Sequence, residues 1–411
     1  MNVLVVGGTG FIGTNVVREL VDRGHAVTVL ARAAENDLPA DTVRVANGDV
    51  TEYGSIEGAF AEQEVVVNLV ALSPLFTPDG GEGMHERVHA DGTENVVEAA
   101  EAHDVRKLVQ MSALGADPDG PTAYLRAKGA AERTVRDAAL DWVLIRPSVI
   151  FGDGGEFIDF TKMLTTPYVT GLPGGGTTRF QPLWVGDLAP MLVDAVENDE
   201  HDEEVYELGG PDVLTLADVT RLVYQADGTS IRVVPIPMVF VKLGLHVGDK
   251  LPGFPMGTDQ YRSLQFDNTV RENDVRAFGL ETDDLRSLAE YLSNGTDGQQ
   301  SPNTRSAWTA RSTLLLFAFL ALTWHLPDVV DIYSYGELPR VLFVPAYLLM
   351  LVLYDNLWGL ENVVYAIDPI VPGSGRYLWD AGLIVTYYLF AVAVTWLGRR
   401  FKPSRHTITP S

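Results

Sequence analysis

The sequence contains no cysteine, which excludes disulfide bonds, thiol nucleophiles and metal sites built on thiolates. Positive charge is also scarce: 30 Lys and Arg residues stand against 55 Asp and Glu, six of the 30 are lysines, and the formal net charge is −25. A chain this acidic argues against nucleic acid as a partner, because phosphate binding needs a basic face. Such a composition favours a halophile protein whose carboxylates hold water, with an ordinary acidic protein as the alternative. No metal site is expected.

The most informative feature lies in the first thirteen residues. An apolar segment runs into Gly-Gly-Thr-Gly-Phe-Ile-Gly at 7–13, and an amphipathic stretch follows to about Arg23. The first glycine permits a tight turn, the third lets a pyrophosphate approach the backbone, and the last allows close packing of helix on strand. The start of the helix then points free amides at the phosphates. A strand-turn-helix without ligand is the alternative. The residues expected at the cofactor here are Gly7, Thr9, Gly10, Phe11, Ile12 and Gly13.

Apolar strands and helical patterns alternate through the first 150 residues. Strands are predicted at 26–31, 64–71, 107–112 and 142–146, and helices at 89–103 and 124–139. This alternation predicts an α/β fold, a Rossmann-type doubly wound parallel sheet. Residues from about 151 to 295 are less regular and richer in Gly and Pro, and we expect them to contribute late sheet elements and a small substrate lobe to one domain, 1–295.

The last quarter of the chain has a different character. A polar linker at 296–307 precedes residues 308–400, which hold three apolar stretches at 312–326, 341–358 and 377–397, and a basic tail at 401–411 follows. With their flanking aromatic residues the stretches approach the length that spans a bilayer. We therefore expect about three transmembrane helices, the lipid bilayer as a partner, and the 1–295 domain on the cytoplasmic side of a cell membrane. Three buried helices of a soluble domain are the alternative.

The orientation of these stretches is not settled by charge. Arg305 and Arg311 precede the first stretch, and a basic cluster at 399–402 follows the last. Both clusters favour the cytoplasmic side, which three full crossings do not allow.

A second set of residues carries candidate chemistry. Tyr124 and Lys128 are four residues apart, so they share one face of a helix. An ammonium beside a phenol is expected to lower the pKa of the phenol, which then exchanges a proton with a substrate oxygen. Ser112 ends a predicted strand, at the edge where open parallel sheets place their ligands. Alone, a Tyr and Lys pair of this kind is more often a surface pair.

Together these motifs resemble the extended and atypical short-chain dehydrogenases/reductases. The resemblance rests on the glycine turn at 7–13, Ser112, Tyr124-x-x-x-Lys128 and Arg-Pro-Ser-Val-Ile-Phe-Gly at 146–152, and it covers residues 1–295. The stretches 124–136, 181–188 and 206–210 are most similar to the branch that includes the dehydrogenase-like accessory subunit of respiratory complex I.

The resemblance implies roles for the matched residues. Tyr124 would be the general acid/base, Lys128 would bind the nicotinamide ribose, and Ser112 would polarise the reacting carbonyl. The further positions that it places at the cofactor are Asp49 and Val50 at the adenine, Ala71 beside the third strand, and Pro147 near the nicotinamide.

The sequence departs from the family pattern at two positions. Members that prefer NAD end the second strand with an acidic residue, whereas Ala31 and Arg32 stand here. Arg32 suits a 2′-phosphate, so NADP(H) is expected over NAD(H), unless this arginine is only a solvated loop charge. His89 stands where extended members often have Asn, either as a pocket residue or as a histidine on a helix face.

Three functions remain open on the sequence alone. The first is a membrane-anchored NADP(H)-dependent oxidoreductase that acts on a lipid-soluble or lipid-linked small molecule. The second is a non-catalytic NADPH-binding subunit that assembles with membrane subunits of the respiratory chain. The third is a nucleotide-sugar epimerase or dehydratase, which cycles its cofactor internally.

Overall fold

The chain forms two compact units, residues 1–299 and 300–411, and the division falls within the predicted linker. The computed structural model describes residues 1–32, 43–236, 258–294, 311–324, 350 and 375–400.

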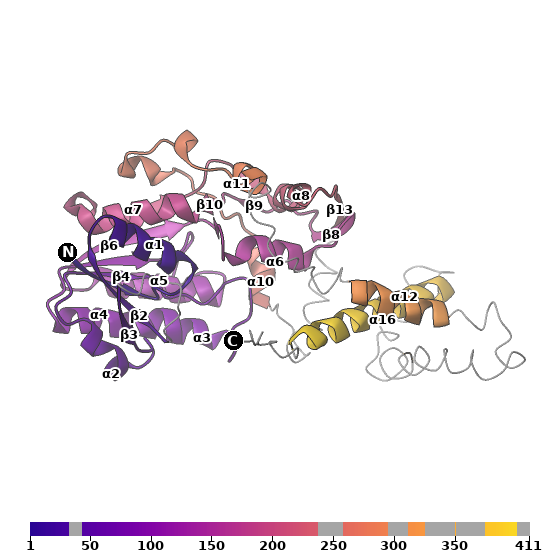
Figure 1. Cartoon of the computed structure of the whole chain (residues 1–411), viewed down its shortest axis with the longest axis horizontal. Coiled ribbons are helices and arrows are strands. Elements are labelled where there is room, and N and C mark those ends of the chain that lie inside the picture. Colours follow the sequence, from indigo (N-terminus) through magenta and orange to yellow (C-terminus); the bar gives the residue numbers. More distant parts are fainter. Residues whose placement is uncertain (33–42, 237–257, 295–310, 325–349, 351–374, 401–411) are drawn as a thin grey trace, which may run out of the picture. The chain divides into compact units, whose positions relative to one another are not determined.

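A seven-stranded sheet forms the centre of the first unit (Figure 1). Its strands pair in the order β11-β6-β5-β4-β1-β2-β3, and every pairing is parallel. The chain order reverses between β1 and β4, which is the position where open α/β sheets bind ligands. The strands are β1 Asn2–Val6, β2 Ala26–Ala31, β3 Val43–Asn47, β4 Val65–Asn68, β5 Lys107–Met111, β6 Asp141–Pro147 and β11 Glu204–Leu208.

Helices cover both faces of this sheet. Figure 1 shows α1 (Phe11–Asp22) and α7 (Val185–Glu197) on one face, and α4 (Gly92–Ala102) on the other. Two apolar clusters match these layers, because successive strand residues point to opposite faces: Val3 and Val5 pack in one, Leu4 and Val6 in the other. The second face also carries α2 Tyr53–Ile56, η1 Glu57–Ala59, α3 Gly83–His85, η2 Glu86–Asp91 and α5 Ala123–Arg136.

The predicted Rossmann-type sheet is confirmed, with two local differences. Strand β3 was not predicted; most of its residues are exposed, as at a sheet edge, so its sequence shows no apolar run. The helix expected at 89–103 begins later, at Gly92, because residues 86–91 form a wider π turn before it.

The region in which a substrate lobe is expected consists of short elements. Its described residues form three two-stranded sheets, β10-β7, β12-β9 and β13-β8, and of these only β12-β9 is antiparallel. Their strands are β7 Ile150–Phe151, β8 Val169–Pro173, β9 Arg179–Phe180, β10 Leu183–Trp184, β12 Leu214–Thr215 and β13 Arg232–Ile236. Its described helices are α6 Glu156–Leu164, α8 Leu216–Ala226 and α10 Thr258–Ser263, whereas η3 Asp199–His201 follows α7 at the amino edge of the main sheet.

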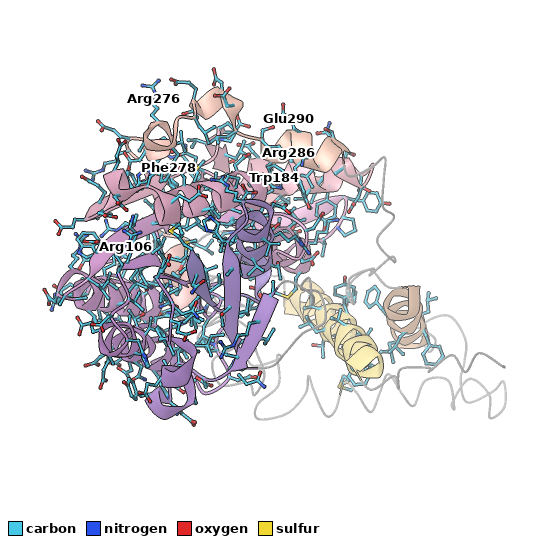
Figure 2. The ribbon with its side chains drawn as sticks, turned by 60° about the vertical axis from the view of Figure 1, so that its left-hand side comes forward. Arg106, Trp184, Arg276, Phe278, Arg286 and Glu290 are labelled. Carbon is cyan, nitrogen blue, oxygen red and sulfur yellow. The ribbon has the colours of Figure 1, made fainter. Side chains whose placement is uncertain are left out.

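Residues 274–294 close the first unit with η4 Asp274–Phe278, η5 Thr282–Asp284 and α11 Leu288–Asn294. Figure 2 shows Arg286 beside Trp184, and the guanidinium lies 4.7 Å from the indole centroid. Phe278 stacks on His201 at a centroid distance of 4.8 Å. Through these two contacts residues 274–294 pack against the rest of the first unit.

The second unit contains helices α12 (Arg311–Trp324) and α16 (Gly375–Arg400), which pack together through Leu320, Leu383 and Tyr387. In the part of the chain that the structure describes, no helix combines the length and the apolar character needed to cross a bilayer. The structure therefore does not support the expected transmembrane region for these two helices. The expected stretch at 341–358 lies outside the described residues except for Met350.

Candidate cofactor and active site

The glycine turn has the geometry that its spacing predicts. Gly7 adopts φ +82°, which only glycine adopts easily, and its N–H donates to the Leu30 carbonyl at 2.8 Å. A Cβ on Gly13 would lie 2.3 Å from the Gly7 oxygen, so a side chain there would separate helix α1 from β1. Gly10 is the N-cap of α1, and no side chain caps the helix. The first amides of α1 therefore remain available to an anion.

This turn fits the pyrophosphate of a dinucleotide. Gly10 is exposed at the mouth of the cleft, and a Cβ there would meet only the Gly7 oxygen, at 3.3 Å. An approaching phosphate thus meets backbone N–H groups and the positive end of α1. The chain can hold such a group without rearrangement.

A cleft of about 520 Å³ opens beside this turn at the carboxyl edge of the sheet. Most of the predicted site residues line it: Gly7, Gly10, Phe11, Ile12, Gly13, Ala71, Ser112, Tyr124, Lys128 and Pro147. Thr9 lies in the turn without lining the cleft. Arg32, Asp49 and Val50 are also absent from the lining; they follow the carboxyl ends of β2 and β3.

Helix α5 positions Tyr124 and Lys128. It begins after Thr122, whose side chain accepts a hydrogen bond from the Leu125 N–H at 3.2 Å. Lys128 follows Tyr124 by one helical turn and is 1% exposed. Its Nζ donates to the Met111 carbonyl at the end of β5, at 3.0 Å. The same Nζ lies 6.0 Å from the centroid of the Tyr124 ring.

The pKa values of Tyr124 and Lys128 differ from those expected. Burial lowers the pKa of Lys128 to about 8, against a smaller raising effect of the Glu132 carboxylate. Burial also raises the pKa of Tyr124 above its usual value. The expectation that the ammonium lowers the pKa of the phenol is therefore wrong, because desolvation outweighs a cation at this distance.

Ser112 lines the cleft but is engaged elsewhere. Its hydroxyl donates to Glu132 Oε1 at 2.5 Å, and both residues are 3% exposed. Arg146 donates to the same carboxylate through Nε at 2.8 Å and Nη2 at 2.6 Å. A hydroxyl has one proton, so in this arrangement Ser112 has none left for a substrate carbonyl. Its predicted role requires the bond to Glu132 to be exchanged.

The adenine end of the predicted site is polar. Asp49 Oδ1 accepts from the N–H and the hydroxyl of Thr51, each at 2.9 Å. Burial opposes ionisation of Asp49, but these bonds, with Arg32 and Arg87 nearby, lower its pKa below the usual value. Arg32 is exposed one residue past β2. Val50, by contrast, is buried and packs beside Gly92, as a core residue does.

Sequence reasoning missed several residues of the site. Glu132 gave no signal, because its partners Ser112 and Arg146 are distant in sequence. Asn268 was also missed; its Oδ1 accepts from the Ser148 hydroxyl at 2.7 Å and the Val149 N–H at 2.8 Å, and the residue lines the cleft. His89, which stands where extended family members often have Asn, is buried against Tyr124 and does not line the cleft.

Comparison with known proteins agrees with this geometry. A family model described as NAD(P)H-binding matches residues 7–164. Subunit 9 of the mitochondrial NADH dehydrogenase [ubiquinone] 1 alpha subcomplex from Arabidopsis thaliana is 30% identical over 297 residues, which cover 67% of this chain and 73% of that protein. The NAD(P)H azoreductase of Xenophilus azovorans is 27% identical over 246 residues, covering 57% and 77%.

Solved structures agree in fold. The crystal structure of a nucleoside-diphosphate-sugar epimerase from Staphylococcus aureus superposes with a TM-score of 0.55 over 71% of this chain and all of that one, at 18% identity. From the glycine turn, the parallel sheet and the Arabidopsis relative together, the chain belongs to the family of NAD(P)H-binding proteins, related to the short-chain dehydrogenases/reductases, that includes this subunit of mitochondrial NADH dehydrogenase.

Proposed function

We propose that this protein is an NAD(P)H-dependent reductase of an apolar carbonyl compound. One observation carries the proposal: the glycine turn and the Tyr124–Lys128 pair open into the same cleft. The remaining walls of that cleft are largely apolar, and include Leu72, Leu75, Phe157, Phe180 and Phe266. An apolar wall favours a lipid-soluble substrate, since few polar groups there would pair with a charged one.

The residues support the direction of reduction. Reduced nicotinamide supplies a hydride when bound, and the carbonyl carbon receives it. Tyr124 donates its phenolic proton to the carbonyl oxygen, so that an alcohol forms, and solvent later returns a proton to the tyrosine. Because burial keeps the Tyr124 phenol protonated, the residue is a proton donor at neutral pH. Lys128 would hold the ribose of the bound cofactor and would stabilise the negative charge that Tyr124 acquires.

Replacement of Tyr124 by Phe tests this function. Oxidation of NADPH and NADH is followed with apolar ketones and quinones, and the variant is expected to lose about 100-fold or more in turnover while binding the cofactor normally. Tyr206→Phe is the matched control. The Tyr206 phenol forms a hydrogen bond with His201, which precedes β11, and neither residue lines the cleft. Full turnover in Tyr124→Phe would refute the mechanism.

A second candidate is a subunit that holds NAD(P)H without turnover and assembles with membrane subunits of a respiratory complex. The bond of Ser112 to Glu132 favours it, since one of the three expected catalytic groups is engaged. The similarity to the Arabidopsis NADH dehydrogenase subunit favours it as well. Isolation in mild detergent distinguishes the two: a stable complex with cofactor that does not exchange supports the subunit, and a free protein with exchangeable cofactor supports the reductase.

A nucleotide-sugar epimerase receives less support. Its substrate carries a diphosphate, which cationic side chains normally hold. Among the described residues that line the cleft, Lys128 is the only cation. Product analysis with nucleotide sugars and no added NAD(P)H would reveal such an activity.

The cofactor preference is also a proposal. Arg32 follows β2 directly and is exposed, and β2 ends at Ala31 rather than at an acidic residue, which favours the 2′-phosphate of NADP(H). Arg32→Ala should weaken NADPH binding about tenfold and leave NADH binding unchanged. Dissociation constants of both cofactors measure this, and equal or tighter NADH binding by the unmodified protein would contradict it.

A further inference from the structure

Two buried histidines, His85 and His89, contact Tyr124, the candidate general acid. His85 ends α3, and His89 follows four residues later in the π turn η2, so both lie on one side of this segment. They are 2% and 1% exposed, and their ring centroids are 5.3 Å apart. π turns are rare and frequently occur at functional sites.

A backbone hydrogen bond sets the protonation of His89. The Leu72 N–H donates to His89 Nε2 at 2.8 Å, so this nitrogen carries no proton and Nδ1 carries it in the neutral ring. Burial, followed by repulsion from Lys128, lowers the pKa of His89 to about 2. Burial also lowers the pKa of His85, where the Asp259 carboxylate acts in the opposite direction and Lys128 adds a smaller lowering effect. The acceptor role of Nε2 thus selects one neutral tautomer of His89.

Both rings also contact Tyr124. The Tyr124 centroid lies 5.6 Å from that of His85 and 5.3 Å from that of His89, with the planes at 77° and 86°. These are edge-to-face contacts, the arrangement that aromatic rings prefer. Lys128 Nζ lies 6.0 Å from the centroid of the same phenol ring, so three side chains surround the ring and restrict its orientation.

We propose that His89 is a positioning residue that fixes Tyr124 relative to the loop after β4. Its ring holds the phenol, and its Nε2 holds the backbone of Leu72 in the loop 72–75 that lines the cleft. One side chain thereby connects the proton donor to the wall that faces the cofactor and substrate. His85 completes the aromatic wall. The proposal rests on the proposed function for its catalytic consequence, but not for the two contacts themselves.

Two variants separate the contacts of His89. His89→Phe keeps an aromatic ring against Tyr124 and removes the acceptor for the Leu72 N–H. His89→Gln keeps an acceptor and removes the ring. We expect His89→Phe to weaken NAD(P)H binding several-fold, and His89→Gln to bind the cofactor normally but to lose about 10- to 100-fold in turnover. The loss in His89→Phe should appear in the KM for the cofactor, and the loss in His89→Gln should appear in kcat. A general loss of structure would change both quantities in both variants.

A buried histidine elsewhere is the control. His201 is 4% exposed and pairs with Tyr206 and Asp194, before the amino end of β11 and so away from the cleft. His201→Phe is expected to lower stability without changing cofactor affinity or turnover per folded molecule.

Nitrogen NMR of the protein with labelled histidine provides a readout that needs no turnover. The His89 signal, identified by its loss in His89→Gln, should show one neutral tautomer with the proton on Nδ1 from pH 5 to 9. If the protein binds NAD(P)H but reduces nothing, the proposed function fails, while this signal and the binding constants still test the positioning role. A His89 that titrates near its ordinary pKa, or folded His89→Phe and His89→Gln with unchanged binding and turnover, would overturn it.

Discussion

Two buried lysines lie at opposite ends of the same strand, and their surroundings differ. Lys107 begins β5 at the amino edge of the sheet and is 0% exposed. Its Nζ lies 2.5 Å from Asp202 Oδ1 and donates to the Asn198 carbonyl at 2.9 Å, with Asp199 Oδ1 at 3.4 Å. The two carboxylates balance the charge of the ammonium, and the ammonium caps the carboxyl end of α7.

Lys128 lies at the other end of β5. Among the described residues, its Nζ has one hydrogen-bond acceptor, the carbonyl of Met111, and burial lowers its pKa to about 8. Glu132, four residues on, is held by Arg146 and Ser112 rather than by the lysine. A cation with donors to spare beside a cleft is prepared for a ligand, whereas a cation whose partners are all present is part of the framework.

The largest expected effect separates the two lysines by activity. Lys128→Met should lose about 100-fold or more in turnover, because the charge beside Tyr124 and the ribose donor disappear together. Its free energy of unfolding at pH 7 should stay equal or rise, since an incompletely paired buried cation is removed. Steady-state kinetics and urea unfolding measure both. A variant that keeps its activity and loses stability would make Lys128 a framework residue.

The second prediction concerns stability at the amino edge. Lys107→Met should lower the free energy of unfolding by about 3 kcal/mol, because Asp202 and the last carbonyls of α7 lose their buried partner. Turnover per folded molecule should not change. Urea unfolding at pH 7 tests the first statement and active-site titration with NAD(P)H the second. A stability equal to that of the unmodified protein would show that the amino edge does not depend on this cation.

Ser112 gives a smaller and mixed effect. Ser112→Ala removes a hydrogen bond to a buried carboxylate that Arg146 still pairs, so stability should fall by about 1–2 kcal/mol. Turnover should fall far less than in Tyr124→Phe, because the serine proton is engaged with Glu132. Kinetics of the two variants side by side decide this. An equal loss in both would show that the serine turns toward the substrate.

The last prediction is a pH dependence of stability. The pKa of Lys128 in the folded protein, about 8, lies below its unfolded value of 10.5, so the unfolded chain binds more protons between these values. Stability should therefore rise with pH from about 8 to 10.5, by at most about 1.4 kcal/mol per pH unit, and this rise should be missing in Lys128→Met. Thermal unfolding of both proteins across this range measures the difference. Parallel curves would mean that Lys128 titrates at its ordinary pKa.

The parts of the site that could be predicted from sequence are local. The spacing of Gly7, Gly10 and Gly13 determines a turn and the start of a helix, and the spacing of Tyr124 and Lys128 determines one helix face. The strands with continuous apolar residues were located for the same reason. Strand β3 was missed because an exposed edge does not require apolar residues.

The rest depends on contacts between distant segments. The bond between Ser112 and Glu132 joins a strand end to a helix 20 residues later, and the bond between Leu72 and His89 joins a loop to a π turn. No periodicity in the sequence signals either contact. The pKa of Tyr124 likewise depends on how completely the surrounding protein removes water, so sequence spacing alone led to the wrong direction.

The sequence by itself determined a dinucleotide-binding turn, a parallel sheet and a tyrosine and lysine on one helix face, because each depends on residues that are close along the chain. Only the tertiary structure decided which of these groups are available. Packing engages the Ser112 proton with Glu132, gives Lys107 several acceptors while leaving Lys128 with one among the described residues, and places two buried histidines beside Tyr124. Burial and partners set the charge and the hydrogen bonds of a side chain, and both come from distant parts of the chain.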